Sequence, residues 1–238
     1  MKNYTGCSGF NYDDWKGKFY PEDVPRNRWL EYYAEKFDTV EINSSFYRLP
    51  SEKTLKNWYG RVPDDFRFTL KGSRYVTHQK KLNQAGEAVK KFYERAGLLQ
   101  EKLACILWQL PGNQHKDIDK LEDFCSVMSG EFLNVLEFRH NSWYDEKVYE
   151  VMNQFGVAFC IISAPDGLSE EAVKTTDHVY MRFHGRHTWY NYLYNHDELK
   201  DWARKLKNLN PGRIYAYFNN DYQAYAPGNA REFQEMID

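Results

Sequence analysis

Charged and polar side chains stand at the ends of several runs that are typical of buried β-strands. Arginine forks bind carboxylates or phosphates at two points, and a buried lysine supplies a point charge or a base. Carboxyl groups and imidazoles exchange protons with substrates. We therefore expect proton-transfer roles for Glu41, Glu137 and His184, and an anion held by Lys71, Arg139 and Arg182.

These side chains need a scaffold that brings strand ends together. Eight runs rich in β-branched or aromatic residues predict strands. They are YTGCS (4–8), TVEIN (39–43), FRFTLK (66–71), LACILWQ (103–109), LNVLEFR (133–139), VAFCIIS (157–163), HVYMRFH (178–184) and RIYAYFN (213–219).

Amphipathic segments between most of these strands repeat apolar residues at i, i+3, i+4 and i+7, which predicts helices. Their ranges are 30–37, 89–96, 118–128, 148–155 and 199–206. Ser51 and Asp117 are the expected N-caps of two helices. The segment 164–177 is weak for helix, and the last helix, near 229–237, is expected to be short.

The regular alternation predicts parallel βαβ units. A length of 238 residues fits one (β/α)8 barrel, for which about 250 residues is typical. An open doubly wound sheet would favour a glycine-rich phosphate turn after its first strand, and GCSGFNYDDW does not match that turn. We expect a single TIM-type barrel domain over residues 1–238, with an eight-stranded parallel closed sheet and outer helices.

In such a barrel, alternate residues of each strand face the helices and the interior. If Val40 and Ile42 face the helices, Glu41 and Asn43 face inward. The same rule turns Gln109 and Asn219 inward, at the carboxyl ends where active sites of these barrels lie. We therefore add Asn43, Gln109 and Asn219 to the expected ligand site. The alternative is a structural network of ion pairs.

Two aromatic loops follow the first and seventh predicted strands and should lie over the pocket. Most of their rings are expected to pack against one another, because a long loop needs its own small core. Trp15, Trp189 and Tyr190 are the best candidates for ligand contact, since aromatic rings stack on bases or sugars.

No cofactor is predicted, and a divalent metal is the alternative. Glu41, Glu137, His184 and Asp221 offer oxygen and nitrogen ligands on separate strands. No local spacing such as H-E-x-x-H supports that reading, and three nearby cations oppose it.

The formal net charge of −2 and a pI of about 6.4 give no general attraction to nucleic acid or anionic membrane. No apolar run approaches 18 residues, so no membrane span is expected. The four cysteines are isolated, and a cytoplasmic location is the simplest expectation. The oligomeric state is left open.

The chain also resembles the YecE-like family, also called the domain of unknown function 72 family. The similarity runs from the first strand almost to the C-terminus and rests on several motifs in matching order. They are GCSGFNYDDWKGKFYP (6–21), FDTVEINSSFYRLPS (37–51), FTLKGSRYVTH (68–78), LWQLP (107–111), LEFRHNSW (136–143), YMRFHGR (180–186) and YFNND (217–221). The resemblance implies a (β/α)8 barrel and implies no particular reaction.

The leading hypothesis is an enzyme, a hydrolase or an isomerase, acting on a small phosphorylated or carboxylated and sugar-like ligand. The first alternative is metal-assisted phosphodiester chemistry on nucleic acid. The second is a protein that binds a ligand without catalysis.

Overall fold

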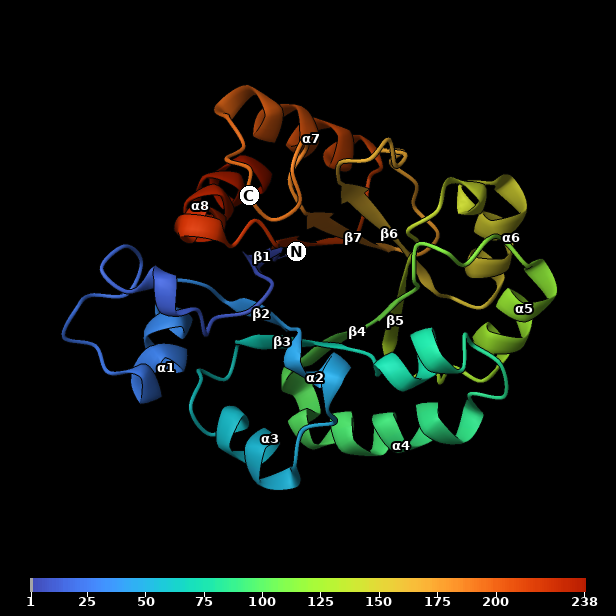
Figure 1. Ribbon diagram of the computed structural model, residues 1–238, viewed down its shortest axis with the longest axis horizontal. Coiled ribbons are helices and arrows are strands. Elements are labelled where there is room, and N and C mark those ends of the chain that lie inside the picture. The colour runs from blue at the N-terminus through green and yellow to red at the C-terminus, as the bar shows by residue number, and fades with distance from the viewer. Residues whose placement is uncertain (1) are drawn as a thin grey trace.

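The computed structural model describes residues 2–238 and contains a closed barrel of eight parallel strands (Figure 1). Each strand pairs with the next, and β1 pairs with β8 to close the sheet. The strands are β1 Tyr4–Cys7, β2 Thr39–Ile42, β3 Arg67–Lys71, β4 Leu103–Gln109, β5 Leu133–Glu137, β6 Ala158–Ser163, β7 His178–Phe183 and β8 Arg213–Phe218. The predicted (β/α)8 fold is confirmed.

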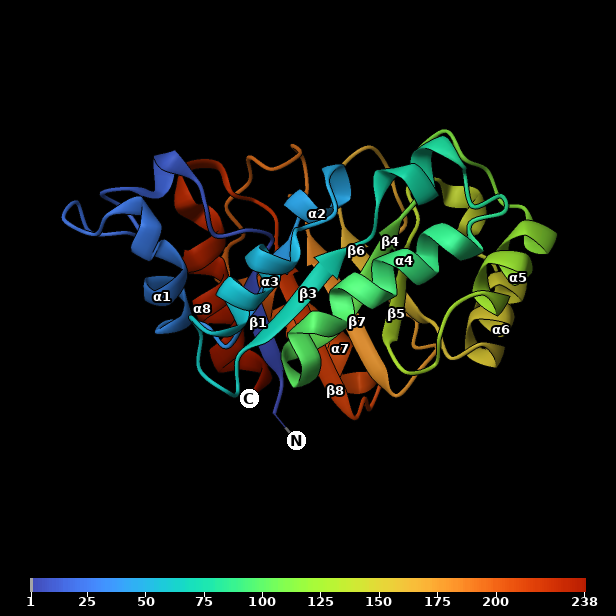
Figure 2. The same cartoon turned by 90° about the horizontal axis from the view of Figure 1, so that it is seen from below.

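Helices surround this sheet, as the side view shows (Figure 2). They are α1 Trp29–Ala34, α2 Ser44–Tyr47, α3 Glu52–Tyr59, α4 Gly86–Ala96, α5 Ile118–Ser126, α6 Glu146–Gln154, α7 His196–Asn208 and α8 Tyr225–Ile237. Ser51 and Asp117 cap α3 and α5 as predicted, each accepting a backbone N–H three residues on.

The last helix is longer than expected. Helix α8 has 13 residues and begins at Tyr225, whereas the sequence predicted a short helix near 229–237. Pro227 and Gly228 look like helix breakers in the sequence. A proline in the first turn of a helix is tolerated, however, because the N–H that it lacks would have no partner inside the helix.

Inward and outward residues form two separate apolar clusters, as the alternation rule requires. Val40, Ile42 and Leu70 belong to the cluster between sheet and helices. Tyr180 and Tyr217 belong to the cluster inside the barrel. The predicted facing of the strands is therefore confirmed.

The carboxyl ends of the strands lie at the top of Figure 2, together with α2 and the loops that follow the strands. The amino end of β1 and the carboxyl end of α8 lie at the opposite face (Figure 2). Within residues 2–238, no helix is long and apolar enough to cross a membrane.

Candidate functional site

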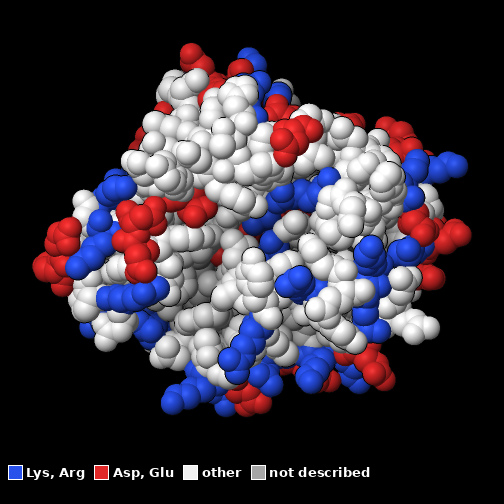
Figure 3. Space-filling model, in the orientation of Figure 1, with Lys and Arg blue, Asp and Glu red and all other residues white. Residues whose placement is uncertain are grey.

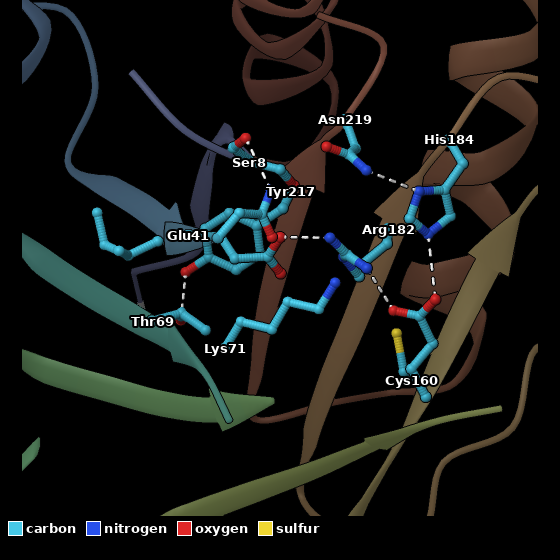
Figure 4. A network of polar contacts seen from close by, with 12 residues as sticks. Ser8, Glu41, Thr69, Lys71, Cys160, Arg182, His184, Tyr217 and Asn219 are labelled. Atoms are coloured by element: carbon cyan, nitrogen blue, oxygen red, sulfur yellow. Dashed lines mark hydrogen bonds and ion pairs between the residues drawn. The ribbon is translucent and has the colours of Figure 1, made fainter. Parts of the chain in front are cut away.

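A chain of buried ion pairs crosses the barrel between β2 and β5. Arg182 on β7 donates to Glu41 at 2.6 Å through one terminal nitrogen and to Glu137 at 2.5 Å through the other. All three side chains are shut off from solvent. Figure 4 shows the Arg182 guanidinium facing Glu41. Breaking a buried pair on one side is costly, because it leaves an uncompensated charge.

The same network continues toward the carboxyl end through Glu137. Arg139 pairs with Glu137, and His184 Nε2 lies 3.3 Å from it. The other ring nitrogen of His184 lies 3.1 Å from the amide nitrogen of Asn219 (Figure 4). Burial and the charges of Arg139 and Arg182 hold the pKa of His184 well below its ordinary value. The imidazole is therefore neutral.

Glu137 remains ionised in this setting. Burial acts to raise its pKa, but the guanidiniums of Arg139 and Arg182 outweigh burial and hold the pKa well below its usual range. Below the network, the Tyr180 hydroxyl donates to Glu41 at 2.5 Å. Two carboxylates and two guanidiniums thus balance in one network, in which Glu41, Glu137 and Arg182 are enclosed and Arg139 reaches the cavity above.

A polar cavity of about 340 Å³ opens above this layer. Its lining residues come from six strand ends and loops. They are Tyr12, Asn43, Tyr47, Lys71, Arg139, Tyr190, Asn219 and Asp221. Figure 3 shows this face of the molecule hollowed near its centre, with basic atoms in the hollow. Tyr47 and Tyr190 stand at the mouth and are 75% and 44% exposed.

Lys71 lies at the tip of β3, and its side-chain amine forms no hydrogen bond or ion pair with the rest of residues 2–238. Its position is fixed locally, because Ser45 donates to the Lys71 carbonyl at 2.7 Å and the ammonium lies 4.5 Å from the centre of the Phe46 ring. The side chain points toward Arg182 (Figure 4). Burial, with a further contribution from Arg182, lowers the pKa of Lys71 to about 7.

Asp221 follows β8 and lines the same cavity. The Trp15 indole donates to the Asp221 backbone carbonyl at 2.9 Å and so fixes the loop. Burial raises the pKa of the Asp221 carboxyl to about 6, and nearby Asp14 adds to the effect. One cavity therefore holds an amine and an acid that both change protonation state near neutral pH.

A second cavity, of about 480 Å³, lies beside the first and shares Arg139 with it. Gln109, Asp166 and Trp189 also line it. The Trp189 ring covers the Arg139 guanidinium at 4.4 Å, and its indole donates to Asp166 at 2.5 Å. Arg139 thus lies between the Trp189 ring and the Glu137 carboxylate. Its Nη1 nitrogen makes no hydrogen bond to residues 2–238.

The structure separates the predicted site residues into three groups. Cavity-lining positions are taken by Asn43, Lys71, Gln109, Arg139, Trp189, Tyr190 and Asn219. Fully enclosed positions are taken by Glu41, Glu137, Arg182 and His184. Trp15 is fully buried among aromatic rings of its loop and lines neither cavity. The catalytic and ligand-binding roles assigned from sequence stay predictions.

Sequence reasoning assigned no ligand-binding role to three residues that line the first cavity, Tyr12, Tyr47 and Asp221. Tyr12 lies in the loop after β1 and Tyr47 ends the four-residue helix α2, and both segments are too short for a periodicity that indicates direction. Asp221 was considered only as a metal ligand, although it lies two residues beyond the inward-facing Asn219.

The alternative metal site, built from Glu41, Glu137, His184 and Asp221, is not assembled. Among residues 2–238, no group of three or more histidine, cysteine, aspartate or glutamate side chains is placed to hold a metal ion. The physical reason is that the Arg182 guanidinium occupies the space between Glu41 and Glu137.

The closed sheet and the polar cavity at its carboxyl end define a (β/α)8 barrel protein with a candidate site in the usual place for this fold. Residues 4–238 match the family described as "Protein of unknown function DUF72". The chain belongs to this family, which confirms the resemblance seen in its motifs.

Individual relatives agree with this assignment. The chain is 25% identical to the UPF0759 protein YunF of Bacillus subtilis, over 99% of this chain and 94% of YunF. A crystal structure of a DUF72 family protein from Thermotoga maritima is 31% identical and superposes with a TM-score of 0.91, covering 100% and 99% of the two chains. A structure of D-psicose 3-epimerase with D-tagatose from Clostridium cellulolyticum shares the fold, at 11% identity and a TM-score of 0.59 over 99% and 97% of the chains.

Proposed function

We propose that the protein is an enzyme that binds a small anionic ligand, phosphorylated or carboxylated, in the cavity at the carboxyl ends of the strands. The observation that carries this proposal is the unpaired Lys71 amine in a cavity that also exposes Arg139. The Lys71 amine has no anionic partner within residues 2–238, and Arg139, although paired with Glu137, keeps Nη1 without a hydrogen bond, so an anion fits both groups.

Charge balance beneath the cavity supports this proposal. The carboxylates of Glu41 and Glu137 are already matched by the guanidiniums of Arg182 and Arg139. Neither carboxylate is therefore left to neutralise Lys71. A phosphate or carboxylate would accept from the Lys71 ammonium and from the remaining Arg139 nitrogen, and hydrogen bonds to charged groups contribute about 1.5–3 kcal/mol each.

The walls of the cavity suggest what the rest of the ligand resembles. The amides of Asn43 and Asn219 and the rings of Tyr47 and Tyr190 surround the cationic floor. Amides bind hydroxyl groups, and aromatic rings cover the apolar face of a sugar. A sugar-like ligand fits these walls. The fold shared with D-psicose 3-epimerase is compatible with it but says nothing about this chain's substrate.

For the proton-transfer role, the enclosed network argues against direct contact of Glu41 with a ligand. Both of its oxygens are engaged, and Glu137 lies equally deep. In our proposal these two carboxylates position the charged groups that form the floor of the cavity and contribute negative charge to it. Lys71 and Asp221, which line the cavity, are the groups that exchange protons with the ligand.

Isothermal titration with inorganic phosphate tests the anion site. We expect Lys71→Met to raise the Kd for phosphate by at least about tenfold, because a lost charge-assisted bond exceeds 1.4 kcal/mol. Lys53→Met is the matched control, since Lys53 is exposed on α3 and should leave the Kd unchanged.

Equal phosphate affinity in wild type and Lys71→Met would refute the site. Tight binding of a single-stranded oligonucleotide with steep salt dependence would instead favour the nucleic-acid alternative. Ligand binding without turnover, unchanged by Asp221→Asn, would favour the alternative of binding without catalysis.

A further inference from the structure

We infer that the Lys71 amine forms a covalent imine with its ligand, so that the ligand is an anionic aldehyde or ketone. This inference rests on the proposed anion site and specifies the substrate class that the site takes. Arg139 would hold the anionic group, which leaves Lys71 for the carbonyl carbon. The inference is based on three features of the cavity: a free amine, an acid in the lining of the same cavity, and an aromatic wall.

The amine meets the geometric requirements of a nucleophile. Lys71 makes no ion pair with residues 2–238, so no carboxylate has to be displaced before it reacts. Its backbone is fixed by Ser45, and its amine end lies against the Phe46 ring. A lysine beside other cations and away from water is the usual form of an imine-forming residue. The neighbouring charges are Arg182, Glu137, Glu41 and Arg139.

Protonation states near neutral pH support the same step. Since burial brings the pKa of Lys71 to about 7, much of the amine is neutral at that pH. Since burial raises the pKa of Asp221 to about 6, a fraction of this carboxyl still carries a proton. Nucleophile and acid are therefore available together between about pH 6 and 7.

The step balances without any further reactant. The Lys71 nitrogen lone pair attacks the carbonyl carbon, the C=O π pair moves to oxygen, and the nitrogen proton passes to that oxygen. The resulting carbinolamine loses its hydroxyl as water after Asp221 gives up a proton. The product is a protonated imine in the cavity that the Asp221 carboxylate also lines. Its positive charge makes a neighbouring C–H bond more acidic, which suits proton-transfer or carbon–carbon cleavage chemistry.

Trapping with sodium borohydride tests the inference. Hydride adds to the imine carbon and leaves a stable secondary amine, which peptide mass spectrometry locates. Glyoxylate and dihydroxyacetone phosphate are the carboxylated and phosphorylated probes. We expect the adduct at Lys71 to form at least about tenfold faster than at exposed Lys53, and excess phosphate to suppress it. Asp221→Asn should slow it by about 10²-fold, the typical contribution of a general acid.

Lys71→Arg separates the inference from the proposed function, because arginine keeps the positive charge and forms no imine. Phosphate binding in wild type, with adducts spread equally over Lys71 and Lys53, would overturn the imine and leave the anion site standing. A Lys71 adduct that excess phosphate leaves untouched would mean that the imine forms but the anion site is wrong. An adduct at Lys71 that phosphate suppresses would support both.

Discussion

Replacing Lys71 by methionine should make the protein more stable at neutral pH. The folded state lowers the pKa of Lys71 from 10.5 to about 7, so folding disfavours its proton. At about 1.4 kcal/mol per pH unit, this difference sets an upper limit of about 5 kcal/mol on the stability lost to this one amine. Methionine has a similar length and carries no charge to desolvate.

The expected gain is smaller than this limit. The Lys71 side chain keeps some solvent contact through the cavity, and methionine loses the contact of the ammonium with the Phe46 ring, which is worth about 0.5–1 kcal/mol. We expect the free energy of unfolding to rise by about 1–3 kcal/mol at pH 7.

The pH dependence gives a sharper test. Between pH 7 and 10.5 the unfolded chain holds a proton on Lys71 that the folded chain lacks, so wild-type stability should rise with pH relative to the variant. The advantage of Lys71→Met should therefore be full below pH 7 and shrink as the pH rises toward 10. Lys53→Met should change stability by less than about 0.5 kcal/mol at any pH.

Urea unfolding followed by tryptophan fluorescence measures this, since the chain has seven tryptophans. A Lys71→Met variant less stable than wild type at pH 7 would refute the reasoning. It would show that Lys71 is ionised and paired in the native protein.

The opposite effect on stability is expected for Arg182, which lies one layer below Lys71. Arg182→Met should lower the free energy of unfolding by about 3–5 kcal/mol at pH 7, because two carboxylates are left buried without their cation. This loss of stability should become smaller as the pH falls, because a carboxyl then takes up a proton. A loss under about 1 kcal/mol in urea unfolding would contradict this. Sulfate, whose charge is constant from pH 6 to 9, should bind more weakly to wild type as the pH rises through about 7, since Lys71 then loses its proton. Titrations at pH 6.5 and 8 check this, and Lys71→Met should show no such change.

The fold could be predicted in detail because burial on two faces constrains each strand. Every predicted strand overlaps an observed one, and the inward and outward sets were separated correctly. The start of α8 was predicted wrongly, since a proline and a glycine inside its first turns carry the same local signal as a loop.

For the site, the sequence predicted only which side chains face the interior of the barrel. Alternation shows that Glu41 and Lys71 both face inward, but it does not show how deep each lies. In the observed register Glu41 pairs with Thr69, so Lys71 lies one inward step closer to the carboxyl end. Likewise Arg182 pairs with Tyr217, and Asn219 lies one step above. Depth depends on register between strands, which no single strand encodes.

This register explains why the same residue types have different consequences at the two levels. In the lower layer, the two terminal nitrogens of Arg182 meet Glu41 and Glu137 from other strands, and these three side chains are closed to solvent. One step higher lies the cavity, and the Lys71 amine has no such partner among residues 2–238. The lower layer still acts on the upper one, because Arg182 contributes to the lowered pKa of Lys71 while Glu41 and Glu137 oppose it. The buried network is therefore the floor of the cavity, and its charges adjust the pKa of Lys71, which burial lowers most strongly.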